Sequence, residues 1–166
     1  ADDLDKVLTA SGRGVVHHVQ AAATSISQAT EAGTIYRPAE IAAIAEVARR
    51  HGVRLHMDGA RFTNALVAQN VGPADLTWRA GVDALECNFS CPHGLPERRM
   101  GSAMGEDPAI LEEVCGWVMA AAKVPVWAKM TPNVTRIEDP SRAALRAGCQ
   151  GISAINTIRS VIGVNL

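Results

Sequence analysis

The 166-residue chain has an ordinary globular composition, with 48% hydrophobic and 20% charged residues, which excludes a disordered or collagen-like protein. Its 16 basic and 17 acidic residues leave a net charge of −1, so no broad electrostatic surface for nucleic acid or an anionic membrane is expected. No apolar stretch approaches the roughly 20 residues of a membrane helix, and no secretory signal is recognised. We therefore expect a cytoplasmic protein with a single domain over residues 1–166.

The first elements along the chain are predicted from hydrophobic periodicity. A helix over residues 2–8 is followed by an extended segment whose strand core covers residues 22–26. Pro38 suits the first helical position, and Ile41, Ala45 and Ala48 form one apolar stripe, which predicts a helix over residues 38–50. A strand over 53–57, helices over 62–69 and 73–80, and a strand over 82–89 come next.

The second half of the chain continues the alternation. A long loop is expected from residue 91 to about residue 105. Asp107 and Pro108 predict the start of a helix that reaches residue 122. A strand over 124–130, a helix over 141–147 and a strand over 151–155 complete the pattern, and residues 158–166 form an apolar tail.

Strands that alternate with helices are typical of a parallel sheet with right-handed crossovers. We therefore predict an α/β fold with about five parallel strands in chain order, as a half-barrel-like or open sheet. A doubly wound, flavodoxin-like sheet with helices on both faces is the alternative.

The four cysteines do not predict a disulfide framework or a metal centre. Cys87, Cys91 and His93 form a CxxxCxH pattern, but a second pair of zinc ligands is missing. Reduced thiols, including Cys115 and Cys149, are therefore expected, with no metal site.

Polar residues gather at the carboxyl ends of the predicted strands, where parallel α/β proteins carry their chemistry. They are Asp58, Arg61, Asn88, Ser90, Cys91, Lys129, Asn156 and Thr157. Lys129 stands in an otherwise apolar strand, which favours a position at a site. A protonated Cys91 thiol could act as a general acid. Asn88, Ser90 and Asn156 could instead serve turns, and Asp58 could cap the following helix.

Residues 12–20, 25–34 and 55–62 resemble low-specificity L-threonine aldolases, which are PLP-dependent and have the aspartate-aminotransferase-like fold. The matching motifs include GRGVVHHVQ and LHMDGARF, and the resemblance covers about residues 1–85. It implies that Asp58 pairs with the pyridine nitrogen of PLP and that Arg61 lies beside the cofactor. The segment that should carry the Schiff-base lysine after residue 85 is replaced by ECNFSCPHG.

That segment, together with AKMTPNVT and AINT, resembles the FMN-binding barrel of dihydropyrimidine dehydrogenases over about residues 84–166. The resemblance implies that Asn88 and Lys129 contact FMN. It makes Cys91 the acid that protonates the pyrimidine ring, and it assigns Ser90, Asn156 and Thr157 to substrate binding.

We interpret the chain as an engineered chimera with its fusion point near residues 81–86, where both families place a helix before a strand. The aldolase part, residues 1–85, lacks its lysine, and the part from 86–166 has three of the eight barrel strands. The expected function is a recombined α/β protein with no complete active site and no bound cofactor. An FMN-dependent reductase remnant and a PLP-binding remnant without aldolase activity are the alternatives.

The sheet is also expected to make the protein self-associate. Five strands cannot close into a barrel, and strands that are apolar on both faces would leave one face uncovered. We predict a homodimer that buries this face and the strand edges.

Overall fold

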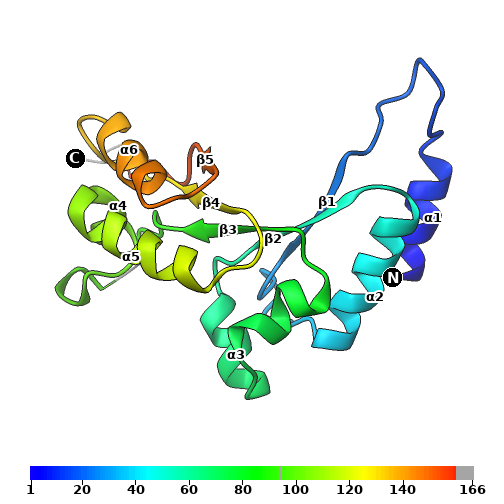
Figure 1. Ribbon diagram of the computed structural model, residues 1–166, viewed down its shortest axis with the longest axis horizontal. Coiled ribbons are helices and arrows are strands. Elements are labelled where there is room, and N and C mark those ends of the chain that lie inside the picture. Colours follow the sequence, from blue (N-terminus) through cyan, green and yellow to red (C-terminus); the bar gives the residue numbers. More distant parts are fainter. Residues whose placement is uncertain (94, 160–166) are drawn as a thin grey trace, which may run out of the picture. The chain divides into compact units, whose positions relative to one another are not determined.

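The computed structural model describes residues 1–93 and 95–159 (Figure 1). The chain forms two compact units. Unit 1 contains residues 1–85 and 123–125, and unit 2 contains residues 86–122 and the chain from residue 126 onward. The single domain proposed for residues 1–166 stays a prediction.

Unit 1 is built on two complete parallel strands. Strand β1 (Ala23–Ser27) pairs with β2 (Arg54–Asp58), with Ile26 opposite Met57. Strand β3 (Ala84–Asn88) begins in this unit. Just before it, the backbone N–H of Asp83 donates to the carbonyl oxygen of Leu55 at 2.8 Å, which brings β3 alongside β2.

The helices of unit 1 are α1 (Asp2–Ala10), α2 (Pro38–Arg50) and α3 (Phe62–Gln69). Helix α2 begins at the predicted proline, and the Glu40 carboxylate accepts a hydrogen bond from the Arg37 backbone N–H at 2.7 Å. This side chain satisfies a backbone donor that the first helical turn leaves unpaired. Helix α2 therefore has the bounds that the sequence predicts.

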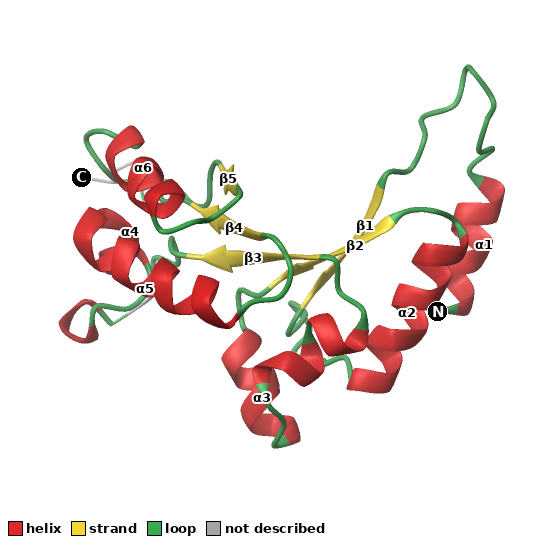
Figure 2. Cartoon of the chain, in the orientation of Figure 1, coloured by secondary structure: helices red, strands yellow, loops and turns green. Residues whose placement is uncertain are grey.

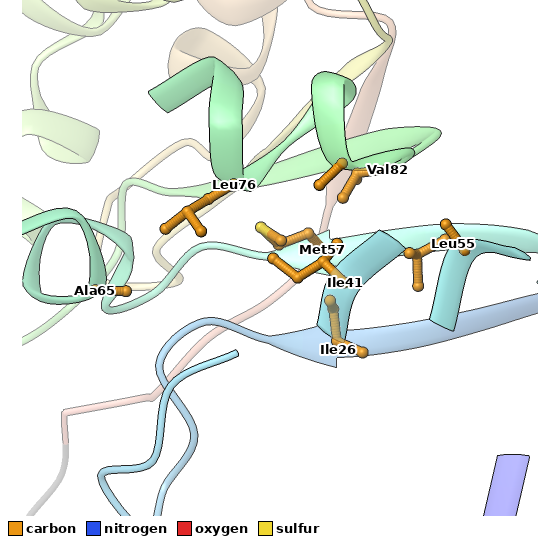
Figure 3. Packing of buried hydrophobic residues seen from close by; sticks show 9 residues of the cluster. Ile26, Ile41, Leu55, Met57, Ala65, Leu76 and Val82 are labelled. Atoms are coloured by element: carbon orange, nitrogen blue, oxygen red, sulfur yellow. The ribbon is translucent and has the colours of Figure 1, made fainter. Parts of the chain in front are cut away.

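The core of unit 1 lies between the sheet and these helices (Figure 3). Ile26 of β1 and Leu55 and Met57 of β2 contact Ile41 of α2 and Leu76. Ile41 and Ala45 of α2 and Ala65 of α3 belong to the same buried cluster as these strand side chains, so α2 and α3 pack on the face that carries Ile26, Leu55 and Met57.

Unit 2 contains the end of β3 and strands β4 (Val126–Lys129) and β5 (Gly151–Ser153). Strands β4 and β5 are parallel, with Ala128 opposite Ile152. The Phe89 backbone N–H donates to the carbonyl oxygen of Lys129 at 3.2 Å, so β3 and β4 are neighbours.

The helices of unit 2 are α4 (Ser102–Glu106), α5 (Pro108–Ala121) and α6 (Glu138–Arg146). Asp107 caps α5 as predicted, because its Oδ1 accepts hydrogen bonds from the backbone N–H groups of Ala109 and Ile110 at 2.9 and 3.2 Å. Leu111 of α5 and Ala144 of α6 pack with Val126 and Ala128 of β4 in one buried cluster. The helices of this unit thus also cover one strand face.

Three local predictions need correction. Residues 73–80 form two 3₁₀ turns, Pro73–Leu76 and Trp78–Ala80, in place of one helix. The Thr77 hydroxyl donates to the Pro73 carbonyl oxygen, and the backbone of Thr77 is not helical (φ −124°, ψ −113°), which separates the two turns. The expected loop after Cys91 contains a 3₁₀ turn over Pro96–Arg98 and helix α4. Helix α6 begins at Glu138, before the predicted residue 141.

The strands are not apolar on both faces, contrary to the expectation behind the dimer. In β4, Val126 and Ala128 are buried, whereas Trp127 is 41% exposed and Lys129 is half-buried. In β2, Leu55 and Met57 are buried, and Arg54 is exposed. Side chains alternate across a strand, so the apolar set faces the helices and the other face is mainly polar.

The α/β class is confirmed: five parallel strands alternate with helices in an open sheet of order β1-β2-β3-β4-β5 (Figure 2). Within each unit, the described helices share a buried cluster with one strand face, which favours the open, singly wound sheet over the flavodoxin-like alternative. Among the described residues, no helix is both long and apolar enough to span a bilayer.

Candidate functional site

The carboxyl end of β3 turns sharply at Asn88 and Ser90. Asn88 Oδ1 accepts hydrogen bonds from the Ser90 backbone N–H at 2.9 Å and from the Ser90 hydroxyl at 2.7 Å. A side-chain oxygen that bonds the chain two residues on mimics a backbone turn and fixes its direction. Ser90 is fully buried, so this turn is a rigid part of unit 2.

The carboxyl end of β5 supplies two more predicted residues to the same place. Asn156 Nδ2 donates to Asn88 Oδ1 at 3.3 Å, and the Thr157 hydroxyl donates to Asn156 Oδ1 at 3.2 Å. Asn133, which follows β4, donates from Nδ2 to the Thr157 carbonyl oxygen at 3.0 Å. The structure therefore joins Asn88, Ser90, Asn156 and Thr157 in one hydrogen-bonded chain, which we call the β3–β5 amide cluster.

Lys129 lies at the end of β4 and forms an ion pair with Glu86 of β3. The Ser153 hydroxyl of β5 donates to the other carboxylate oxygen of Glu86. The Lys129 and Glu86 side chains are only 20% and 9% exposed, so the charges satisfy each other in a partly buried setting. Lys129, Glu86 and Ser153 thus connect three neighbouring strands on the face that carries Asn88.

Glu86 is a residue that the sequence analysis missed. It stands two positions before Asn88 in β3, and residues two apart in a strand share a face. The sequence therefore contained a signal for Glu86, namely a carboxylate two positions before Asn88 and on the same face of the strand.

Cys91 follows Ser90 and is half-buried. Its carbonyl oxygen accepts a hydrogen bond from the Ser102 backbone N–H at 2.9 Å, which attaches the loop to the start of α4. Cys91 therefore lies directly after the turn that Asn88 fixes, and its role as a general acid stays a prediction.

A cavity of about 660 Å³ adjoins this region of unit 2. It is lined by α4, α5, α6 and the loop after β4, including Glu106, Pro108, Pro132, Asn133, Arg136 and Asp139. Asn133 lines the cavity and donates to the Thr157 carbonyl oxygen, so it connects the cavity to the β3–β5 amide cluster. Its volume falls within the range of small-molecule sites.

The predicted PLP-type residues lie in unit 1. Asp58 ends β2, and its Oδ1 accepts a hydrogen bond from the Ala60 backbone N–H at 2.9 Å. It does not cap α3, whose N-cap is Arg61. The Arg61 guanidinium donates to both carboxylate oxygens of Glu31, at 2.9 and 2.8 Å, and this pairing holds the pKa of Glu31 below its usual value.

Gln28 is a second residue that the sequence analysis missed, and it holds Asp58 and Arg61 in place. Its backbone N–H donates to the Asp58 carbonyl oxygen at 2.9 Å, and its carbonyl oxygen accepts from the Arg61 N–H at 3.3 Å. Its fully buried side chain exchanges two hydrogen bonds with the backbone of Tyr36. No sequence signal distinguished this glutamine from a solvated one.

The residues of unit 1 do not fit a covalently bound PLP. The 166 residues contain three lysines, Lys6, Lys123 and Lys129. Lys6 belongs to α1, and Lys123 comes just before Pro125, whose carbonyl oxygen binds the Leu85 N–H at the start of β3. In parallel strands the start of β3 lies at the edge opposite to the end of β2, so Lys123 and Asp58 occupy opposite ends of the unit.

The residues of unit 2 fit the donor chemistry of a flavin ring. Asn88 and Lys129 come from neighbouring strands, and an amide and an ammonium group can donate to the ring's carbonyl and nitrogen acceptors. Asn88 Oδ1 and the Lys129 ammonium already bind protein groups. Flavin binding would therefore use their remaining donor capacity.

Comparison with known proteins finds two kinds of relatives. The dihydropyrimidine dehydrogenase (NADP(+)) of Arabidopsis thaliana is 64% identical over 92 residues, which are 55% of this chain and 22% of that protein. The NAD-dependent dihydropyrimidine dehydrogenase subunit PreA of Escherichia coli (strain K12) is 42% identical over 93 residues, or 56% of this chain and 22% of that protein. The low specificity L-threonine aldolase of Pseudomonas aeruginosa is 47% identical over 70 residues, or 42% of this chain and 20% of that protein.

Both resemblances predicted from the sequence are confirmed, and the chain is a mosaic of the two kinds of segment. It spans about a fifth of the length of these curated relatives. A family profile described as beta-eliminating lyase matches residues 1–123, which extends past the predicted fusion point into the dehydrogenase-like part. Through this match over most of its length, the chain belongs to the beta-eliminating lyase family.

Proposed function

We propose that these 166 residues form a recombined α/β protein without a complete catalytic site, joined near residues 81–86. Two relatives with different printed activities, a dehydrogenase and an aldolase, each match about half of the chain. The division between the two compact units falls between Leu85 and Glu86. A join inside β3 is compatible with both parts, because each part needs a parallel strand at that point.

The lysine positions carry this proposal. A PLP-dependent lyase needs a lysine that forms a Schiff base with its cofactor. Lys123 lies at the opposite end of unit 1 from Asp58, and Lys129 is ion-paired with Glu86 in unit 2. Asp58 and Arg61 can therefore offer PLP polar contacts only, which is the weaker alternative of a PLP-binding remnant without aldolase activity.

The β3–β5 amide cluster favours a second candidate, an FMN-binding remnant of the dihydropyrimidine dehydrogenase type. In it, Asn88 and Lys129 would hold the flavin, and Ser90, Asn156 and Thr157 would orient a pyrimidine. A bound flavin supplies hydride transfer, and the Cys91 thiol would hold the proton for the ring carbon. The cluster supports this candidate because it brings residues from β3 and β5 together.

Absorbance spectra separate the three candidates. The purified chain is mixed with FMN or PLP, desalted and scanned, and a PLP sample is treated with borohydride before digestion. We expect no retained flavin band and no lysine peptide carrying reduced PLP. Retained FMN that is lost in Asn88→Ala would establish the second candidate, and a PLP-labelled lysine would overturn the lysine argument. Arg54→Ala, on the other unit, is the control for nonspecific flavin loss.

A further inference from the structure

Ser25 and His56 form a hydrogen-bonded pair on two neighbouring strands of unit 1. Ser25 Oγ lies 2.9 Å from His56 Nδ1, although 31 positions separate the two residues in the sequence. They are direct partners in the register of β1 and β2, so their side chains project from the same face of the sheet. Neither residue belongs to the PLP-type or flavin-type residues described above.

The apolar core on the other face of the strands holds this pair in place. Ile26, which follows Ser25 in β1, is 6% exposed. Leu55 and Met57, which flank His56 in β2, are 0% and 1% exposed. Because buried neighbours fix both strands, the hydroxyl and the imidazole are held at hydrogen-bond distance before any reactant arrives.

The backbone of β1 directs the Ser25 N–H away from β2. At one end of the strand pair, the Arg54 N–H donates to the Ala22 carbonyl oxygen at 3.1 Å. At the other end, the Gln28 N–H donates to the Asp58 carbonyl oxygen at 2.9 Å. Backbone groups alternate in direction along a strand, so the even-numbered residues of β1 bond to β2 and Ser25 points its N–H to the opposite edge. Since β1 ends the strand order of the described sheet, this N–H can donate to a ligand.

The two side chains differ in their exposure to solvent. Ser25 is exposed, whereas His56 is half-buried and its Nε2 atom is shielded from solvent. Nδ1 is therefore the ring nitrogen that faces the serine and can take up its proton. A serine within hydrogen-bond reach of a base is the arrangement that activates a hydroxyl nucleophile.

We propose that Ser25 is a nucleophile with His56 as its general base, and that it accepts the acyl group of small activated esters. Aryl esters of short carboxylic acids are the fitting class, because an exposed serine at a sheet edge can be reached without opening the core. This reactivity needs neither PLP nor FMN, so it is independent of the function proposed above.

The acyl transfer balances without a cofactor. As Ser25 Oγ attacks the ester carbonyl carbon, its proton passes to His56 Nδ1 and an electron pair of the C=O bond moves to the oxygen. The outward Ser25 N–H donates to this oxyanion. The bond between the carbonyl carbon and the phenolate oxygen then breaks, the proton returns from His56 to the solution or the leaving group, and Ser25 carries the acyl group as an ester.

Acetylation by p-nitrophenyl acetate tests the proposal on the full chain. We expect a fast release of nitrophenolate that is stoichiometric with the chain, followed by slow turnover. Trypsin cleaves after Arg13 and Arg49 but not between Arg37 and Pro38, so Ser25 lies in peptide 14–49. Fragmentation of this peptide should place the acetyl group on Ser25, and acetylation of lysines in other peptides is background.

Two serines on one strand provide a matched pair of variants. Ser25→Ala should lose the fast release and the acetyl group in peptide 14–49. Ser27→Ala should keep both, because Ser27 is an exposed serine of the same strand whose register partner is Asp58. His56→Gln keeps a hydrogen-bonding side chain but no base, so acetylation of Ser25 should become about 100-fold slower.

Wild-type protein in urea supplies a comparison that depends on no variant. The unfolded chain retains both serines and loses the pairing of β1 with β2, so the selectivity for Ser25 over Ser27 should disappear. Equal acetylation of the two serines in the folded chain, or a selectivity that persists in urea, would overturn the proposal. So would an unchanged acetylation rate in a His56→Gln variant whose circular dichroism matches the wild type.

Discussion

At the residue scale, the ion pair between Lys129 and Glu86 in unit 2 determines how much a substitution of a predicted site residue should destabilise the fold. The sequence predicts Lys129 as a site residue, because it stands in an otherwise apolar strand. The structure gives it a second task, because Glu86 is 8% exposed and uses Lys129 as a charged partner. The contact that attaches the loop at Cys91 is made by the Cys91 backbone carbonyl oxygen, which a side-chain substitution leaves in place.

Lys129→Ala should therefore be costlier than Cys91→Ala. Removing the cation of a buried ion pair lowers the free energy of unfolding by about 3–5 kcal/mol. We expect a smaller loss of about 1–3 kcal/mol for Lys129→Ala, because the Lys129 side chain is 20% exposed. Cys91→Ala should change the free energy of unfolding by less than about 1 kcal/mol. Urea titration measures both values.

The double variant Lys129→Met with Glu86→Gln is the matched control. It removes both charges and keeps the side-chain volumes, so it should recover part of the stability that Lys129→Ala loses. A Cys91→Ala variant less stable than Lys129→Ala would show that the loop, and not the ion pair, supports this edge.

At the element scale, helix α4 depends on one glycine. A Cβ at Gly105 would lie 2.0 Å from the Phe89 carbonyl oxygen and 3.4 Å from Thr131 Cγ2. The short helix can therefore approach the end of β3 only because residue 105 has no side chain. Gly116 of α5 is different, because a Cβ there meets no atom within 4 Å.

Gly105→Ala should lower the free energy of unfolding by about 1–3 kcal/mol through overpacking. Gly116→Ala should leave it unchanged or raise it by up to about 1 kcal/mol, since alanine favours a helix interior. Thermal unfolding followed by circular dichroism compares the two. Equal melting temperatures would mean that α4 can move away from Phe89 at little cost.

Helix α1 is attached to α2 by a small apolar cluster and by a hydrogen bond between Asp5 and His51 whose strength depends on pH. Leu8 packs with Val47 and Ala48, and His51 Nε2 lies 2.7 Å from Asp5 Oδ1. The His51 hydrogen bond and the Arg50 charge hold the pKa of Asp5 below its ordinary 3.8. The folded state therefore prefers the ionised carboxylate.

A lowered folded-state pKa contributes stability above the unfolded pKa, and that contribution disappears as the pH falls through the folded pKa. Asp5→Asn should therefore be less stable than the wild type at neutral pH. The difference should shrink below pH 3.8, the ordinary pKa of this carboxyl, as wild-type Asp5 becomes protonated. Urea titrations at several pH values test this, and a gap that stays constant with pH would contradict it.

At the scale of the whole molecule, the homodimer stays a prediction, and its expected contact surface changes from the sheet face to exposed apolar helix residues. The strand face away from the helices is mainly polar. The large exposed apolar side chains of unit 2 include Trp117 of α5, which is 63% exposed, and Leu145 of α6, which is 49% exposed. Helices α5 and α6 pack together and are bridged by Arg146 and Glu112 at 2.6 Å.

We predict a two-fold dimer at micromolar concentration that Trp117→Glu converts to a monomer, because the charge would be buried at the contact. Val67→Glu, on the 77% exposed Val67 of α3, should leave the mass unchanged. Light scattering after size-exclusion chromatography gives the masses. A monodisperse wild-type monomer would refute the dimer.

The sequence by itself determined the α/β class, the bounds of α2 and the capping of α5, because helix caps and apolar periodicity are local properties. It also identified both kinds of relative, and it located Asn88, Ser90, Lys129 and Asn156 near strand ends. Their roles in binding or catalysis remain predictions. The 3₁₀ turns of residues 73–80 escaped prediction because their composition is that of a short helix.

Only the tertiary structure decided which distant residues meet. Asn156 donates to Asn88 across 68 positions of sequence, and Ser153 donates to Glu86 across 67. Such contacts depend on strand register and on the packing of helices against the sheet, which no local pattern encodes. The same reason explains why the ion pair of Glu86 with Lys129 became visible only in the folded chain.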